Sequence, residues 1–207
     1  MNTFIEILSF IIFIGTCYLI GSLPSGYLAG KWFAGIDLRE TGSGSTGATN
    51  VLRHVGKGPA LAVFIIDVGK GAAAVLIAKA LSLGETLQVA AGLTALIGHI
   101  WPVWLRWKGG KAVATGLGML LGLSWPVGLA SLGIFLTSIT FSRIVSLSSI
   151  TAAFCLPFLI FLSSIGNTFN PMFFLVGVLA MLMILWRHRS NIQRLIKGTE
   201  PKIGKSN

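Results

Sequence analysis

The amino-acid sequence predicts an all-α integral membrane protein, built as a bundle of seven transmembrane helices. Hydrophobic residues make up 54% of the 207 positions and charged residues only 11%, whereas soluble domains carry about 25% charged residues. Apolar runs of about 20 residues, long enough to cross a bilayer, recur along the chain. Lysine and arginine concentrate in alternate connections between these runs, which is the pattern of cytoplasmic loops.

The seven apolar runs are the expected membrane spans: Phe4–Tyr27, Pro59–Leu83, Leu87–Leu105, Ala112–Ser124, Trp125–Phe141, Leu147–Ile165 and Pro171–Trp186. The fourth and fifth adjoin, because the stretch they share is too long for one span and Pro126 offers a natural break. Counting them as one would place the basic C-terminal tail outside the cell, against the charge rule. We see no internal repeat or soluble domain and expect one domain over residues 1–207.

Charge sets the expected orientation, with the N-terminus outside and the C-terminus in the cytoplasm. Of the 16 lysines and arginines, all but Lys70 and Lys79 lie in the connections 30–58, 98–111 and 142–149 or in the tail from residue 187. The opposite connections, near Glu85, Ser124 and residues 166–170, hold none. The net charge of +10 therefore reflects membrane topology and lipid headgroups rather than a nucleic-acid partner.

Basic, cysteine and acidic residues each argue against another class of protein or site. The first apolar run has no lysine or arginine before it, so it reads as a retained span rather than a cleavable signal peptide. Cys17 and Cys155 lie inside apolar runs and indicate no disulfide framework. The six acidic residues are scattered singly, so no carboxylate cluster is available for a metal, and we expect no metal or cofactor.

The most distinctive polar stretch runs from Gly42 to Arg53 and is called here the glycine loop. Its three glycines can take positive φ and turn successive backbone N–H groups toward one anion. Hydroxyl groups add donors, and a closing arginine can hold a phosphate with two hydrogen bonds. We interpret the glycine loop as a phosphate pocket, with Ser43, Gly44, Gly47, Asn50 and Arg53 as the binding residues.

The glycine loop invites two false matches and leaves one alternative interpretation open. Gly42-x-Gly44-x-x-Gly47 fits the dinucleotide-binding fingerprint, but that motif needs a βαβ unit, and nothing here predicts one. The stretch also resembles a P-loop, yet Ala48 stands where the phosphate-binding lysine belongs. An ordinary flexible membrane loop is the open alternative, since glycine, serine and threonine are common in loops.

Residues 98–111, called here the basic loop, form the second anion-friendly segment. Gly109 and Gly110 stand between Lys108 and Lys111, so the backbone can approach an anion with ammonium groups on either side. Plain cytoplasmic charge with a glycine turn explains the segment equally well in isolation. His99 alone is more consistent with a packed histidine than with a base.

The second span carries Asp67 and Lys70, one helical turn apart. A charge at the bilayer centre costs about 2.5–3.5 kcal/mol on insertion scales, so we expect the two side chains to pair with each other. We favour a structural ion pair over direct contact with a substrate.

Polar residues also gather at the last two cytoplasmic segments. Ser149 enters the sixth span, where serine is common as a helix cap. His188 and Asn191 are three apart and would share a face of a helix. One could orient or deprotonate a hydroxyl while the other stabilises an oxyanion. Alternatively, residues 187–197 are a short interfacial helix whose basic side chains face lipid headgroups.

Taken together, these stretches closely resemble the bacterial membrane acyltransferases of the PlsY type, which acylate glycerol 3-phosphate from acyl phosphate. The resemblance covers nearly the whole chain, and Ser45 and Thr46 stand where relatives often have Asn and Val. The motifs that carry it are Gly21-Ser22 with Pro24 and Gly26, Asp37-Leu38-Arg39, Gly42–Arg53, Asp67-x-x-Lys70-Gly71, Gly98-His99 to Lys111, Ser146-Leu147-x-Ser149-Ile150, and Arg187-His188-Arg189-x-Asn191-Ile192-x-Arg194-Leu195 with Glu200.

The resemblance implies transfer of a fatty acyl group to the 1-hydroxyl of glycerol 3-phosphate. The products would be lysophosphatidate and phosphate, in the first step of phospholipid synthesis at the cytoplasmic face of the inner membrane. It implies catalytic roles for His188, Asn191, Ser149 and Lys111, substrate binding by Ser43, Gly44, Gly47, Asn50, Arg53, Gly109, Gly110 and Lys111, and supporting roles for Asp67, Lys70 and Glu200. The implied partners are glycerol 3-phosphate, a long-chain acyl phosphate, membrane lipid, and, as a candidate, the enzyme that makes acyl phosphate.

Two rival functions follow from the residues. A transporter for a phosphorylated solute needs polar groups that continue through the bilayer, but here they crowd one face and the outer half is nearly bare. A CDP-alcohol phosphotransferase needs an aspartate cluster for a metal. The His-x-x-x-x-Asp signature of other glycerolipid acyltransferases is absent after His54, His99 and His188, which disfavours a thioester donor.

Overall fold

The apolar runs fold as helices, because a backbone in lipid must satisfy its polar groups within its own segment. The computed structural model describes residues 3–165 and 169–204, and within them it contains ten α-helices, one 3₁₀ helix and no strand. The all-helical prediction is confirmed, and these residues provide no strand for the βαβ unit that a dinucleotide fingerprint needs. Lys205 and most of the predicted 166–170 connection lie outside the described residues.

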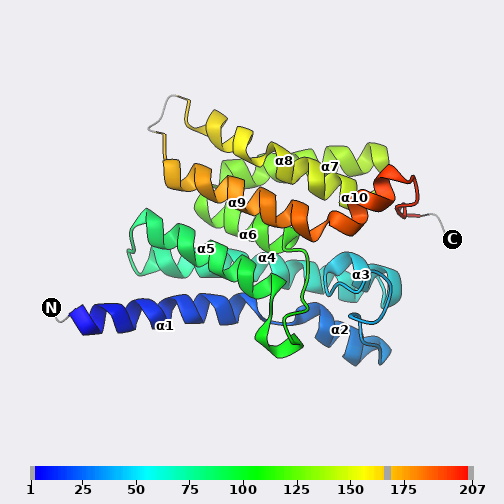
Figure 1. Cartoon of the computed structure of the whole chain (residues 1–207), viewed down its shortest axis with the longest axis horizontal. Coiled ribbons are helices and arrows are strands. Elements are labelled where there is room, and N and C mark those ends of the chain that lie inside the picture. The colour runs from blue at the N-terminus through cyan, green and yellow to red at the C-terminus, as the bar shows by residue number, and fades with distance from the viewer. Residues whose placement is uncertain (1–2, 166–168, 205–207) are drawn as a thin grey trace. The chain divides into compact units, whose positions relative to one another are not determined.

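The chain divides into two compact units, Met1–Leu123 and Ser124–Asn207, called here unit 1 and unit 2. Unit 1 contains α1 (Thr3–Gly21), α2 (Ser25–Ala34), α3 (Ala48–His54), α4 (Lys57–Ala80), α5 (Glu85–Ile100), the 3₁₀ helix η1 (Val103–Leu105) and α6 (Val113–Leu123) (Figure 1). Unit 2 contains α7 (Trp125–Ser142), α8 (Val145–Ser163), α9 (Pro171–Arg187) and α10 (Arg189–Ile196).

The expected spans fall on helices, although the first contains nearly all of α1 with the start of α2, and the third contains most of α5 and η1. Five stretches are long and apolar enough to cross a membrane, or six if the bent pair α9 and α10 counts as one: Thr3–Ala34, Lys57–Ala80, Glu85–Leu105, Trp125–Ser142 and Val145–Ser163. Helix α6 is apolar but shorter. The predicted break between the fourth and fifth spans is confirmed as a helix break, because α6 ends at Leu123 and α7 begins at Trp125 with Pro126 in its first turn.

The first span differs from its prediction. The predicted Phe4–Tyr27 lies inside the candidate span Thr3–Ala34, but this span is not one continuous helix, because α1 ends at Gly21 and α2 begins at Ser25. The intervening residues include Pro24, which has no N–H to continue the helical ladder. The chain therefore changes from one helix to another inside an apolar segment, and the backbone carbonyls at this α1–α2 junction need other partners.

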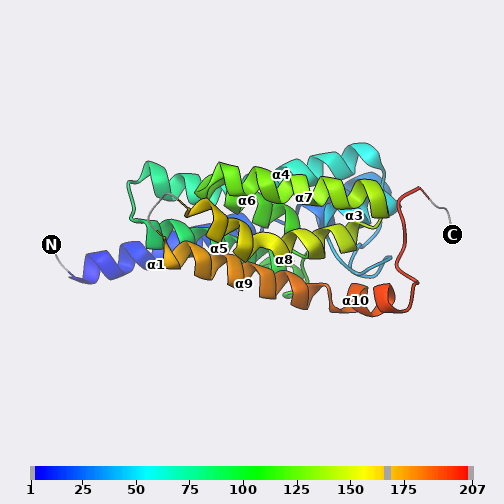
Figure 2. The same cartoon turned by 90° about the horizontal axis from the view of Figure 1, so that it is seen from above.

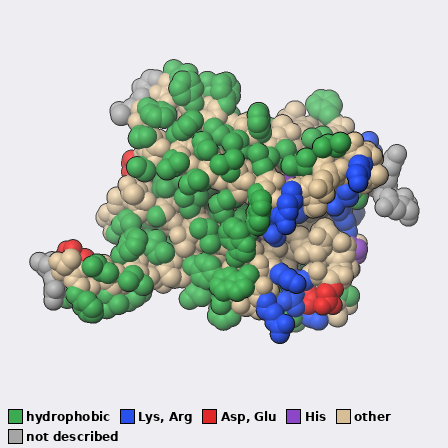
Figure 3. Space-filling model, viewed as in Figure 1, with side chains coloured by type: hydrophobic (Ala, Val, Ile, Leu, Met, Phe, Trp, Pro, Cys, Tyr) green, Lys and Arg blue, Asp and Glu red, His purple; other side chains and the backbone are tan. Residues whose placement is uncertain are grey.

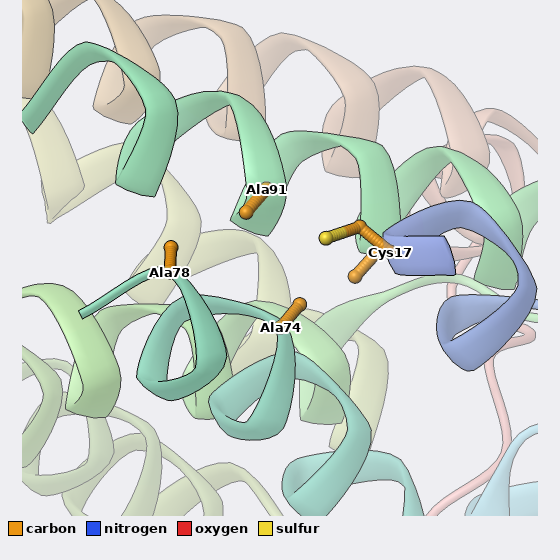
Figure 4. Packing of buried hydrophobic residues seen from close by; sticks show 5 residues of the cluster. Cys17, Ala74, Ala78 and Ala91 are labelled. Carbon is orange, nitrogen blue, oxygen red and sulfur yellow. The ribbon is translucent and has the colours of Figure 1, made fainter. Parts of the chain in front are cut away.

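Helix α4 packs against α5 and α6 at the centre of unit 1, and small residues make the contacts. A Cβ placed on Gly71 of α4 would meet the backbone of Thr115 in α6, and one placed on Gly118 of α6 would meet that of Val68. Cys17 of α1 faces small alanines of α4 and α5 in the same unit (Figure 4). Membrane helices gain stability from such close backbone approach, because lipid gives little hydrophobic drive for association.

Unit 2 is a row of antiparallel-connected helices in which α8 packs against both α7 and α9 (Figure 2). Gly177 of α9 lies against the Ile160 side chain of α8. Helix α10 turns away from α9 by 62°, which confirms the predicted short helix after the last span. The tail then returns to the α7–α8 turn, where the Ile203 N–H donates to the Arg143 carbonyl at 2.8 Å.

The surface of unit 1 separates apolar from basic residues. Large hydrophobic side chains such as Phe4 and Ile12 of α1 are 70% and 60% exposed, and Figure 3 shows hydrophobic atoms covering this helix. Lysine and arginine side chains gather instead near α2 and η1 on the face drawn there. An apolar surface of this kind fits lipid contact.

Because α4 and α6 approach closely at Gly71, adding a side chain there should destabilise the protein more than adding one elsewhere on α4. We expect Gly71→Ala to lower the free energy of unfolding by about 1–3 kcal/mol, because the added methyl overpacks against α6 backbone. Gly69→Ala is the matched control on the same helix, since nothing lies within 4 Å of its Cβ position. Thermal unfolding of both variants in detergent measures the difference, and an equal midpoint for the two would contradict this packing.

Candidate functional site

The glycine loop turns sharply at two of its three glycines. Gly42 and Gly44 have φ values of 60° and 66°, a conformation that favours glycine. The expectation that Gly47 also takes positive φ is wrong, because its φ is −77° and it leads directly into α3. The loop thus has two left-handed turns followed by a short helix, which was not predicted.

Asn50 holds the glycine loop in shape. Its side chain is 2% exposed, and its Nδ2 donates to the carbonyls of Leu38, Thr41 and Ser45 at 3.2, 2.9 and 2.9 Å. Its Oδ1 accepts from the Ser43 N–H at 3.3 Å. This amide therefore organises the loop backbone, a role that the sequence interpretation as a direct binding residue did not include.

The two side chains best suited to an anion lie on the surface of this scaffold. Ser43 and Gly44 are exposed in the loop, and Arg53 is exposed on α3, one turn after Asn50. Helix α2 packs directly against the loop backbone, because Gly26 approaches the Thr46 carbonyl too closely for a Cβ. Charged and hydroxyl groups thus project from a loop whose base is buried.

Arg39 joins the segment just before the glycine loop to the basic loop. It pairs with Asp37 through an Nη2–Oδ2 contact of 2.6 Å, lies 5.0 Å from the ring centroid of Tyr27 and donates from Nη1 to the Leu105 carbonyl at 3.4 Å. The hydrogen bonds and charge of Arg39 lower the pKa of Asp37 to about 2. The pair therefore stays ionised throughout the physiological range.

The basic loop is anchored by its glycines. The Gly109 and Gly110 N–H groups donate to the carbonyls of Ile100 and His99 at the end of α5, each at 3.1 Å. These two N–H groups therefore bind the end of α5, and the predicted approach of this backbone to an anion stays a prediction. Lys111 lies two residues before α6 begins and is half-buried.

The predicted intramembrane ion pair is confirmed. Lys70 Nζ lies 2.8 Å from Asp67 Oδ1, and both side chains are almost fully buried. His99 is packed as expected, 6% exposed, with its Nδ1 3.7 Å from the same carboxylate oxygen.

Unit 2 centres on the buried carboxylate of Glu200. Its Oε1 accepts hydrogen bonds from Ser146 Oγ at 2.7 Å and Asn191 Nδ2 at 2.6 Å. Its Oε2 accepts from Arg194 Nε at 2.7 Å. Burial alone would raise the pKa of Glu200, but these three hydrogen bonds and the arginine charge outweigh burial and lower it. The carboxylate thereby fixes the amide of Asn191, which orients its carbonyl oxygen as well.

His188 and Ser149 are buried, at 2% and 4% exposure. The His188 ring contacts the Ile184 carbonyl through Nδ1 at 2.8 Å. A carbonyl oxygen only accepts, so Nδ1 carries a proton, and in the neutral ring Nε2 bears the lone pair. The Ser149 hydroxyl donates to the Val145 carbonyl at 2.9 Å. In the neutral ring, Nε2 is therefore the nitrogen that can accept a proton.

The sequence analysis named candidate binding and catalytic residues but missed several residues that form hydrogen bonds or ion pairs around them. Within unit 1 it assigned no role to Ser25, Asp37 or Arg39, and within unit 2 it assigned none to Ser146. Asp37 and Arg39 gave a usable signal, because opposite charges two residues apart beside the glycine loop can pair. Ser25 and Ser146 gave none, because their partners lie 42 and 54 positions away.

Comparison with known proteins places these features in context. A family model described as glycerol-3-phosphate acyltransferase matches residues 11–198. A glycerol-3-phosphate acyltransferase of Prochlorococcus marinus (strain MIT 9313) is 72% identical over 189 residues, covering 91% of this chain and 92% of the relative. Another from Synechococcus sp. (strain CC9902) is 65% identical over 198 residues, covering 96% and 97%.

Solved structures are similar as well. The crystal structure of PlsY, an integral membrane glycerol 3-phosphate acyltransferase, in its glycerol 3-phosphate form has a TM-score of 0.87 and 35% identity, covering 95% of this chain and 96% of that one. The lysophosphatidic acid form has a TM-score of 0.82 and 33% identity, with the same coverage. The membrane fold is thus shared over nearly the full length.

The Glu200 network predicts a pH-dependent stability. Because the folded pKa is below the ordinary glutamate value of about 4.3, its contribution is complete above that value and is lost as pH falls through the folded pKa. We expect Glu200→Gln to lower the unfolding midpoint at pH 7, by an amount that shrinks below about pH 4.

Glu40→Gln, at an exposed carboxylate, is the control and should leave the midpoint unchanged. Thermal unfolding between pH 3 and pH 8 measures both variants. A wild-type advantage over Glu200→Gln that persists unchanged at pH 3 would contradict the lowered pKa.

Proposed function

Because the chain belongs to the glycerol-3-phosphate acyltransferase family, we propose that it transfers a fatty acyl group from an acyl phosphate to the 1-hydroxyl of glycerol 3-phosphate. It is a membrane acyltransferase, and glycerol 3-phosphate is its acceptor substrate. The proposal rests above all on the family match, which covers the polar segments 30–58, 98–111 and 142–149 in full and the tail as far as residue 198. The acyl phosphate donor and the residue roles below are our extension of it.

The chemistry suits a site made of cations and hydroxyls. The acceptor hydroxyl oxygen attacks the acyl carbonyl carbon, the bond between that carbon and the bridging phosphate oxygen breaks, and inorganic phosphate leaves. Phosphate is a good leaving group, so little general-acid help is needed. The protein must mainly neutralise two phosphates, place the hydroxyl near the carbonyl and stabilise the oxyanion. Arginine, lysine, serine and backbone donors can supply this, without a cofactor.

Unit 1 supplies the phosphate binders. Arg53, Ser43 and Gly44 hold one phosphate at the exposed surface of the glycine loop, where the arginine fork can make two hydrogen bonds. Lys111 binds the other phosphate or bridges both. Asn50, Gly47, Gly109 and Gly110 act by shaping the two loops, since their polar groups or backbones are committed to the scaffold.

The roles proposed for residues of unit 2 follow from the family resemblance and concern the acyl carbonyl and the acceptor hydroxyl. Asn191, fixed by Glu200, and Ser149 assist the carbonyl oxygen. His188 orients the acceptor hydroxyl, and its Nε2 is the atom that can take the proton as the new ester bond forms. A phosphate oxygen of a substrate is the alternative proton acceptor.

We further propose the finer topology. Residues 1–207 act as one polytopic enzyme with seven spans, the short α6 included, an external N-terminus and a cytoplasmic C-terminus, in the bacterial inner membrane. Basic residues of the glycine loop, the basic loop and the tail support this orientation through the positive-inside rule. The active site then faces the cytoplasm, where an enzyme that makes acyl phosphate is the candidate partner. The comparisons lend no support to the transporter alternative.

The donor is tested with purified protein, glycerol 3-phosphate and either a long-chain acyl phosphate or the matching acyl-CoA. We expect lysophosphatidate from acyl phosphate alone, and its loss in Arg53→Ala because the phosphate fork is gone. Activity only with acyl-CoA would overturn the donor. No product from either donor, in protein shown to be folded, would overturn the acyltransferase proposal.

The role of His188 is tested with His188→Gln. If Nε2 takes the proton, kcat falls by about 10²–10⁴ and the pH profile of kcat changes. The KM for glycerol 3-phosphate and the unfolding midpoint are the accompanying readouts. An unchanged kcat would exclude His188 as the base and favour proton transfer to a substrate phosphate.

A further inference from the structure

Three buried polar residues of unit 1 converge on one carboxylate oxygen of buried Asp67, and we call the four residues the Asp67 hub: Ser25, Asp67, Lys70 and His99. Ser25 Oγ donates to Asp67 Oδ1 at 2.7 Å, and Lys70 Nζ lies 2.8 Å from the same atom. His99 Nδ1 is 3.7 Å away. Asp67 is only 1% exposed. The hub therefore joins α2, α4 and α5 inside the apolar core.

Ser25 and Lys70 connect the Asp67 hub to the glycine loop through the α1–α2 junction. Lys70 Nζ also donates to the Leu23 carbonyl at 3.1 Å, a group left without a helical partner by the α1–α2 junction. Ser25 is the first residue of α2. The next residue, Gly26, packs directly against the Thr46 carbonyl of the glycine loop. Any shift of the junction is thus passed to the loop that carries Ser43 and Arg53.

His99 connects the Asp67 hub to the basic loop. A Cβ on Gly110 would overlap the His99 ring, and the Gly110 N–H donates to the His99 carbonyl at 3.1 Å. Gly110 immediately precedes Lys111. The position of the His99 ring against Asp67 therefore bears on the position of Lys111.

We propose that Asp67 and Lys70 are positioning residues that set the placement of the glycine loop and the basic loop relative to each other. This inference rests on the proposed function, because the two loops are the phosphate-binding elements there. The ion pair lies in a low-dielectric core, where a charge without its partner is costly. The ion pair can therefore hold the α1–α2 junction in place without contacting the substrates itself.

The test separates stability from positioning. Asp67→Asn and Lys70→Met each leave one buried charge unpaired, so both single variants lose stability. The double variant leaves no unpaired charge and should unfold within a few degrees of wild type. It still lacks the Lys70 bond to Leu23, so we expect its kcat/KM for glycerol 3-phosphate to stay at least tenfold below wild type.

Lys79→Met is the matched control, since this lysine is on the same helix, is exposed, and donates to the Leu123 carbonyl at 3.4 Å. Lys79→Met should have the wild-type kcat and the wild-type KM for glycerol 3-phosphate. Wild-type kcat and KM in the double variant would overturn the positioning role. A wild type that forms no lysophosphatidate from either donor would instead overturn the proposed function, so the two failures differ.

Ser25→Ala keeps the test decisive if the double variant does not fold. It removes one hydrogen bond and leaves the ion pair in place. We expect a nearly unchanged unfolding midpoint with a KM for glycerol 3-phosphate raised several-fold. An unchanged KM in folded Ser25→Ala would contradict the proposal.

Discussion

The buried contact between Asp67 and Lys70 is the interaction on which unit 1 depends. A break in a helix inside an apolar environment exposes carbonyls that water cannot satisfy, and here the Leu23 carbonyl accepts from Lys70 Nζ at 3.1 Å and from the Ser25 N–H at 3.0 Å. The same lysine is neutralised by Asp67. One pair thus permits the α1–α2 junction, and the junction in turn directs α2 against the glycine loop.

Both units contain a buried carboxylate that hydrogen-bond donors surround. In each, an acidic residue is almost fully buried and surrounded by donors: Asp67 in unit 1 and Glu200 in unit 2. The groups assigned to bind substrate phosphate, Arg53 and Ser43, are instead exposed. Stability and recognition are therefore carried by different residues, so an exposed cation can remain available to an anionic substrate while buried carboxylates keep the scaffold in place.

Much of the fold was predictable because hydropathy and charge act locally along the chain. Apolar length gave the helices, and the break before Pro126 followed from local chemistry. The interruption at Pro24 was missed because the apolar run continues across it. At the candidate site, residue type predicted roles for Arg53, His188 and Asn191, and these roles stay predictions. The hydrogen bonds of Ser25, Asn50 and Ser146 were not predictable, since they depend on tertiary contacts.

The balance between phosphate released and lysophosphatidate formed tests the central claim most directly. Wild-type protein is supplied with acyl phosphate, with and without glycerol 3-phosphate, and both products are quantified over the same interval. Acyl transfer by direct attack predicts equal amounts of the two products and phosphate release that depends on the acceptor. Phosphate released at the same rate without glycerol 3-phosphate would contradict the account, because water rather than the positioned hydroxyl would then be attacking the carbonyl.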